Sequence, residues 1–138
     1  MDMVAADYQL LLDTFLPAIE QVVQAGGGHT LFATVGSDGS VREMKVSLRD
    51  GDSGLVRGPQ VDEALFAREL REGSYRAAAI FTPITVSLND VVTRALVVLL
   101  DHENGEAVSV RIPFEASGPH IVFGEQSRSP VSGRLFDD

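Results

Sequence analysis

The side chains best suited to chemistry gather around one tight turn. His102 and Glu103 stand just before Asn104-Gly105, and Glu115 and His120 follow further along the chain. A histidine beside carboxylates on adjoining strand ends could bind a divalent metal ion, or the groups could act as an acid and base pair. Charged side chains at a hairpin tip are more often simply solvated, and no two histidines stand at a fixed helical or loop spacing. The sequence therefore predicts neither a metal site nor a cofactor.

Three arginines could supply an anion-binding site. Arg76, Arg94 and Arg111 fall in or beside segments that we expect to be strands, and they would line up across a sheet if those strands are neighbours. Alternatively, each could pair with a carboxylate on a solvated face, such as Glu43 or Glu115. A small-molecule site needs an apolar pocket with a few convergent polar groups. The candidate ligand-binding residues are His102, Glu103, Arg94 and Arg111.

The composition and motifs exclude several kinds of chemistry. The sequence contains zero Cys, which rules out disulfides, thiolate nucleophiles and cysteine-ligated metals. The glycines at 26–28 follow a predicted helix instead of opening one, so their amides would not converge on a phosphate. A Gly-x-Ser-x-Gly motif is also missing from the sequence. We therefore assign no catalytic residue, and an enzyme is the less favoured class.

The charge balance bears on partners and location. The 20 acidic and 11 basic side chains give a formal net charge of −9, which repels nucleic-acid backbones and anionic membrane surfaces. An acidic surface could instead meet a basic protein partner. Residues 1–7 lack the basic and apolar regions of a signal peptide, and no apolar run approaches the roughly 20 residues that span a bilayer. We expect a soluble, cytoplasmic protein that binds neither nucleic acid nor membrane.

Two segments have the pattern of amphipathic helices. From Val4 to Gln24, apolar residues recur at the spacing of one helical face. Pro17 lies inside this pattern and predicts a kink or a break near Thr14. The glycines at 26–28 then end the helix. A second helix is predicted over about 60–72, with Pro59 well placed as a first helical residue.

The strands are marked by turn residues and by alternation. Asn104-Gly105 and Asp38-Gly39 each separate two apolar or alternating segments, which predicts two hairpins with turns of type I′. The segment 92–101 is apolar on both parities, which indicates a central strand covered on each face. Pro83 has no amide hydrogen and indicates an edge or a bulge. The predicted strands are 30–35, 41–48, 75–88, 92–101, 107–114 and 121–123.

This order of elements, α–β–β–α–β–β–β–β, predicts the α+β class. We expect one domain over 1–138, with a single antiparallel sheet of five or six strands and two helices packed on one face. Residues 125–138 are rich in Ser, Arg, Pro and Gly and predict an irregular C-terminal arm. The arm ends in an apolar pair, Leu135 and Phe136, which tucks into a groove of its own domain, packs on a second subunit or is disordered. The other face of the sheet then needs cover from this arm, a loop or another subunit.

Three stretches of the C-terminal half resemble a set of small bacterial proteins of uncharacterised function. They are Tyr75–Ile80, Leu99–Phe114 and Phe123–Glu125, and the most specific part is the motif from His102 to Val108. The resemblance implies a small, stand-alone bacterial α+β domain. It implies no catalytic residues.

Two functions of different classes fit these observations. The favoured one is a non-enzymatic protein-interaction module, a homodimer in which the uncovered sheet face or the arm at Leu135 and Phe136 makes the subunit contact. A regulatory or immunity-like role would fit the acidic charge, because acidic surfaces speed association with basic partners. The alternative is a small-molecule-binding protein or small enzyme, with its polar site near the Asn104-Gly105 hairpin.

Overall fold

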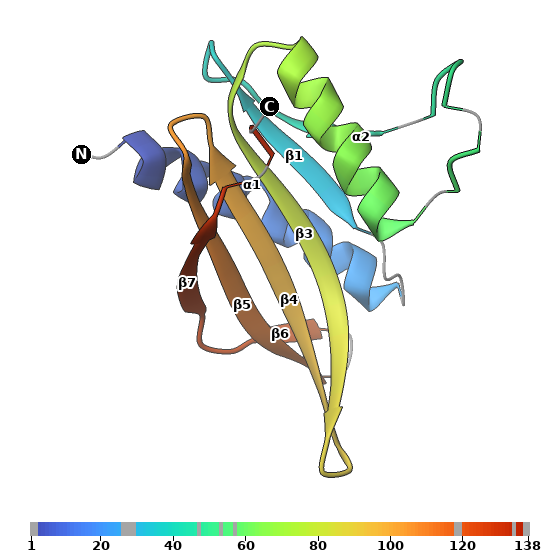
Figure 1. Ribbon diagram of the computed structural model, residues 1–138. Helices are drawn as coiled ribbons and strands as arrows, with labels where there is room; N and C mark the ends of the chain where they lie inside the picture. The colour runs from blue at the N-terminus through green and yellow to red at the C-terminus, as the bar shows by residue number, and fades with distance from the viewer. Residues whose placement is uncertain are drawn as a thin grey trace.

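One antiparallel sheet forms the centre of the molecule (Figure 1). The computed structural model describes residues 3–25, 30–46, 48–52, 54–56, 58–117, 120–133 and 135–136. Within these residues the strands lie in the order β2-β1-β3-β4-β5-β6, and β7 also pairs with β5. The α+β class and the single antiparallel sheet are confirmed, with seven strands instead of five or six. The elements are α1 (Met3–Gln24), β1 (Leu31–Gly36), β2 (Val41–Met44), α2 (Pro59–Glu72), β3 (Tyr75–Leu88), β4 (Val91–His102), β5 (Glu106–Ser117), β6 (His120–Phe123) and β7 (Ser127–Ser132).

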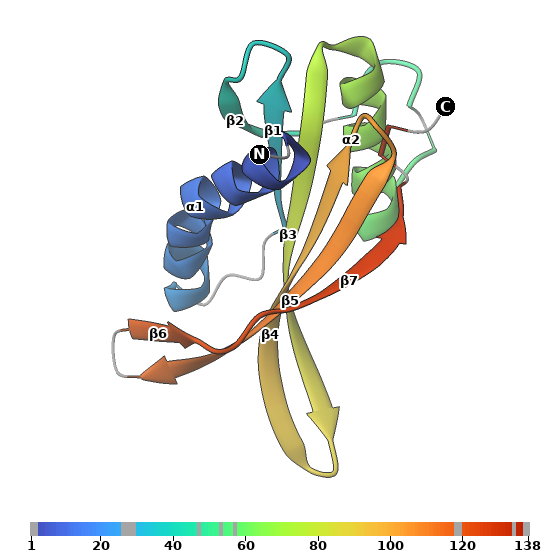
Figure 2. The same cartoon turned by 90° about the vertical axis from the view of Figure 1, so that its left-hand side faces the viewer.

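The two helices lie on opposite faces of the sheet, which corrects the expectation that both pack on one face (Figure 2). Alternate residues of a strand point to opposite faces. In β1, Ala33 packs in the core under α1, whereas Phe32 packs in the core under α2. The reason lies in β4, whose residues 95–100 are apolar on both parities and need cover on each side. The prediction that this strand is central and covered on both faces holds for that part of β4.

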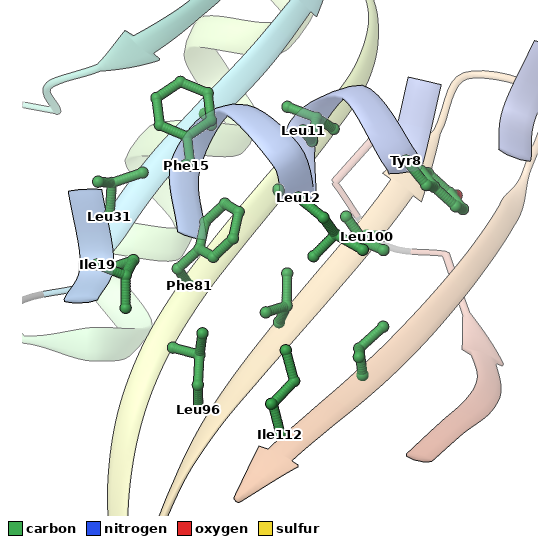
Figure 3. Packing of buried hydrophobic residues seen from close by; sticks show 14 of the residues in the cluster. Tyr8, Leu11, Leu12, Phe15, Ile19, Leu31, Phe81, Leu96, Leu100 and Ile112 are labelled. Atoms are coloured by element: carbon green, nitrogen blue, oxygen red, sulfur yellow. The ribbon is translucent and has the colours of Figure 1, made fainter. Parts of the chain in front are cut away.

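The larger core lies between α1 and the sheet. Every third or fourth residue of α1 is buried against the strands. α1 continues through Pro17 without the predicted break. Pro17 is exposed, so the carbonyl group that it leaves without a helical partner lies on the solvent side of the helix. Figure 3 shows side chains from α1 and the sheet in this core, namely Tyr8, Leu11, Leu12, Phe15, Ile19, Leu31, Phe81, Leu96, Leu100 and Ile112.

Both predicted hairpins are present, but their turns differ from the predicted type. Of each turn pair, only the glycine has a positive φ, 94° at Gly105 and 88° at Gly39. Three residues separate β4 from β5. The amide of Gly105, the last of them, donates to the carbonyl of His102 at 3.0 Å. This is a type I turn followed by a left-handed glycine. The turn with two positive φ angles is instead Asn89-Asp90, at 52° and 64°, between β3 and β4.

The C-terminal arm is more regular than predicted. Residues 127–132 form β7, which pairs with β5 from Glu106↔Ser132 to Arg111↔Ser127. β6 pairs with the other half of β5, so β6 and β7 follow one another along the same edge. The register shifts by one residue between Phe123↔Phe114 and Arg111↔Ser127, which marks a bulge at residues 124–126. The predicted helix end at 26–28 and the turn at 118–119 lie outside the described residues.

The β3–β4 hairpin extends beyond both helices (Figure 1). β1 accompanies β3 only as far as the pair Leu31↔Phe81. Pro83 therefore lies where β3 has become an edge strand, as its missing amide hydrogen predicted. The first four residues of β4, 91–94, are all exposed, whereas most of the rest of the strand is buried. We call residues 82–94 the projecting hairpin.

Candidate functional site

A buried ionic cluster joins α1 to the sheet where β4 turns into β5. Asp7 of α1 is only 2% exposed. Arg76 at the start of β3 donates two hydrogen bonds to its carboxylate, from Nε to Oδ2 at 3.0 Å and from Nη2 to Oδ1 at 2.9 Å. Nε2 of His102, the last residue of β4, lies 3.1 Å from the same Oδ2. The sequence predicted His102 as a site residue and left Arg76 either to an anion site or to a carboxylate partner; the structure shows the second and adds Asp7 as that partner.

The hydrogen bonds fix the protonation of the cluster. Nδ1 of His102 accepts from the backbone amide of Asn104 at 3.4 Å, so we assign the ring hydrogen to Nε2, which donates to Asp7. Burial by itself raises the pKa of Asp7. The hydrogen bonds from Arg76 and His102, together with the charge of Arg76, outweigh burial and hold the pKa of Asp7 below its ordinary 3.8. The carboxylate is therefore ionised at neutral pH.

Tyr8 completes this attachment of α1. Its ring meets that of His102 edge to face, with the centroids 6.3 Å apart, and its hydroxyl donates to the backbone oxygen of Glu106 at 2.8 Å. Each of these contacts ties the helix to the sheet, so the cluster serves as a structural anchor. Sequence reasoning overlooked Asp7, although a signal existed. Asp7 stands on the apolar stripe between Val4 and Tyr8, and a buried carboxylate needs a cationic partner.

The four predicted ligand-binding residues do not converge. Glu103 is exposed in the turn next to His102. Arg94 lies eight residues before His102 on β4, roughly 26 Å away along an extended strand. Its guanidinium group lies 5.1 Å from the centroid of the Phe114 ring. Arg111 is exposed on β5. The structure brings His102 and Glu103 together only as neighbours in sequence and places both arginines elsewhere on the sheet.

Two other polar combinations were considered from the sequence, an anion site and a metal site, and the described residues form neither. Arg76 pairs with Asp7 and does not line up with Arg94 and Arg111 as an anion site. Among the described residues, no three His, Asp or Glu side chains come together as a metal site. The side chain of His120 lies outside what the structure describes.

Leu135 is fully buried within its own chain. It is 0% exposed in the core on the α2 side of the sheet, and Phe136 packs partly against the same core. The backbone amide of Leu135 donates to Oδ2 of Asp101, a buried carboxylate on β4, at 2.9 Å. The arm thus tucks into its own domain, the first of the alternatives drawn from the sequence. A subunit contact through Leu135 would require the arm to leave this position.

A groove opens on the same side of the sheet, beside the N-terminal end of α2. Its volume is about 270 Å³. The floor is apolar and comes from β1, β3 and β4, while the rim carries hydroxyl and carboxylate side chains. The floor consists of Phe32, Ile80, Val97 and Leu99, and the rim of Thr30, Gly58, Pro59, Asp62, Glu63 and Thr82.

The projecting hairpin continues this apolar surface. Val91 and Val92 at its end are 62% and 64% exposed. Strand alternation places Val91 on the side of the groove and Val92 on the side of α1. On the α1 side, Arg94 lies over the ring of Phe114. The α2 side of the hairpin therefore remains the more apolar of the two.

Comparisons with models of protein families, with curated proteins and with solved structures gave no match to this chain. Of the helices in the described part of the chain, neither has the length and apolar character to cross a membrane.

Proposed function

We propose that the protein is a non-enzymatic interaction module of the bacterial cytoplasm that forms a homodimer through its projecting hairpin. The observation that carries this proposal is the exposure of Val91 and Val92, 62% and 64%, at the end of a hairpin that neither helix covers. Clustered apolar groups exposed on a protein surface are typical of interaction sites. A regulatory or immunity-like role, with a basic protein as a further partner, is part of the same proposal.

Charge supports the hairpin as the contact. The chain has a net charge of −9, which opposes the approach of two copies. The projecting hairpin contains one acid, Asp90, and one base, Arg94, so its own formal charge is zero. The hairpins of two copies can therefore meet without net repulsion between them.

The residues first considered for a ligand site support a module without catalysis. His102 is occupied by Asp7 and by the amide of Asn104. Leu135, the first candidate for the dimer contact, is occupied by its own core. The hairpin is then the apolar surface that best fits a partner.

Light scattering tests the proposal. The mass of the wild-type chain should rise from monomer to dimer with concentration, and the double substitution Val91→Asp with Val92→Asp should keep the chain monomeric. The matched control is Val56→Asp, because Val56 is also an exposed valine, 82% exposed, but lies in the segment before α2. A wild-type chain that stays monomeric at every concentration, or a double variant that dimerises like the control, would refute the proposal.

The groove favours a second candidate, a small-molecule-binding protein. Its volume of about 270 Å³ approaches the lower end of known ligand sites, roughly 300 Å³. The test is a thermal-shift screen of small apolar metabolites, with Val97→Asp as the control that fills the floor with charge. A ligand of the groove should raise the melting temperature of the wild type only.

A further inference from the structure

We infer that the dimer forms through the α2 side of the projecting hairpin, which packs face to face and antiparallel on the same surface of a second copy. This inference rests on the proposed function and specifies its contact. It follows from the alternation of side chains along β3 and β4, from the charges beside them and from the symmetry that they allow.

The two sides of the hairpin differ in chemistry. On the α1 side, the register pairs Thr85 with Arg94 and Ser87 with Val92, so three of these four residues are polar. Arg94 also lies over Phe114 there and covers part of the core. On the α2 side, apolar residues and two threonines run without interruption from the hairpin end to the groove. Those that keep contact with solvent are Val91, Thr93 and Val97 on β4, and Thr82 and Ile84 on β3, whereas Ala95, Leu99 and Ile80 between and beyond them are buried within the chain.

The spacing along β4 is self-complementary. Consider a two-fold axis that lies between the two sheets, perpendicular to the strands, at Ala95. It places Val91 of one copy over Leu99 of the other and Thr93 over Val97. The centre is then Ala95, a small side chain that is only 4% exposed, and the exposed Val91 lies at each end over Leu99, which is 7% exposed in the floor of the groove. Sheets packed in this way lie about 10 Å apart, with strands crossing at a small angle. Each hairpin end reaches the groove of the partner.

Charges on β5 fit the same axis. Arg111 lies beside Val97 in the register, and Glu115 follows Phe114, the partner of Arg94. Both point to the α2 side, because the residues that alternate with them belong to the core under α1. The two-fold axis at Ala95 brings Arg111 of one copy over Glu115 of the other. Opposite charges thus meet twice at this interface.

These features favour a second copy over a charged partner. None of the β3 and β4 residues on this side of the hairpin is ionisable, so a basic protein finds no complementary charge along them. Along β3 and β4 themselves, an identical surface brings no like charges together. Arg111 and Glu115 of β5 are complementary when the surface faces its own copy in antiparallel orientation.

Single substitutions of Val91 and Val92 test which side of the projecting hairpin forms the dimer contact. Val91→Asp should raise the dimer dissociation constant at least tenfold, since a carboxylate would enter the apolar contact. Val92→Asp, next in sequence and equally exposed, should leave the constant within about threefold of wild type. At concentrations low enough for all three proteins to be monomers, both variants should melt like the wild type, because both positions are exposed. A dimer that tolerates Val91→Asp but dissociates on Val92→Asp would overturn this inference and leave the proposed function intact. A wild-type monomer would overturn both.

A charge exchange tests the antiparallel orientation. Arg111→Glu and Glu115→Arg should each weaken the dimer about tenfold, because like charges would then face one another. The double variant should return to within about threefold of the wild-type dissociation constant, because the opposite charges are restored in exchanged positions. A double variant as weak as the single ones would contradict the two-fold axis at Ala95.

Discussion

The two ends of β4 have similar sequences and opposite surroundings. Residues 95–102 and residues 91–94 both contain valines at the spacing of a strand, yet most of the first group are buried and all of the second are exposed. The difference comes from their cover. α1 packs on one side of the first group, α2 and Leu135 lie on the other, and neither helix reaches the hairpin end. An apolar strand therefore indicates a surface that needs a partner, which can belong to the same chain or to another one.

The polar groups at the two ends of β4 also differ in whether protein or solvent surrounds them. At the covered end, Asp7 and Asp101 are carboxylates buried under protein, and each accepts hydrogen bonds from a different element. At the projecting end, Arg94 keeps contact with solvent and lies over Phe114. We expect substitutions at the covered end to lower the free energy of unfolding, and substitutions at the projecting end to change association instead.

The largest effect on stability should come from Leu135→Ala. The side chain is fully buried, so its loss leaves a cavity and should lower the free energy of unfolding by about 3 kcal/mol. Urea denaturation followed by circular dichroism measures this change. The control is Val131→Ala in the neighbouring β7, 37% exposed, which should cost under about 1 kcal/mol. Equal costs for the two variants would show that the arm is not held by Leu135.

Asp7→Asn should have the next largest effect. It leaves Arg76 and His102 without their charged acceptor, and breaking a buried ion pair costs about 3–5 kcal/mol. Because Arg76 keeps some contact with water, we expect about 2 kcal/mol in denaturant titrations. Asp13→Asn on the exposed side of α1 should change stability by less than about 0.5 kcal/mol. A cost for Asp7→Asn as small as that of the control would mean that the cluster does not anchor the helix.

The pH dependence of the stability difference between the wild type and Asp7→Asn tests whether Asp7 is ionised in the folded chain. The pKa of Asp7 is lower in the folded chain than its ordinary 3.8, so its contribution to stability is complete above this value and is lost as the pH falls through the folded pKa. The gap in stability between the wild type and Asp7→Asn should therefore be constant near neutrality and close below about pH 4. Asp38, Asp52 and Glu72 also have lowered pKa values, but they are present in both proteins and cancel. A gap that stays constant into strong acid would contradict the assigned ionisation.

The smallest effect should be that of Arg94→Gln at the projecting end. It removes a cation from the face of Phe114, which is worth about 0.5–1 kcal/mol at an exposed site. Arg94→Lys retains a cation and should lose less. Thermal unfolding of the three proteins measures the order. If Arg94→Gln cost more than Asp7→Asn, the contrast between the two ends would fail.

The sequence predicted the elements better than their arrangement. Asn104-Gly105 and Asp38-Gly39 located two hairpins, because glycine at a positive φ is required in either kind of turn. Asn89-Asp90 was overlooked, since it contains no glycine. The placement of the helices could not be read from periodicity, which shows that a helix has an apolar face and leaves open which side of the sheet it covers. Only β4, apolar on both parities, contained that information.

The candidate site was harder to predict than the fold. His102 was recognised by its chemical type, but its partners lie 95 residues away at Asp7 and on another strand at Arg76. Such pairs depend on the tertiary fold. Leu135 illustrates the same limit, because an apolar residue in a polar tail predicts burial without saying in which subunit.

The interrupted edge formed by β6 and β7 has a consequence for aggregation. An exposed strand edge with regular, unpaired amides invites open-ended addition of further strands and growth into fibres. Here the edge is broken by the bulge at 124–126, and Pro130 has no amide hydrogen to donate in the middle of β7. Arg128 adds a charge to the same strand. These features discourage linear polymers, so a chain with exposed valines elsewhere on its sheet can associate in closed pairs and remain dispersed.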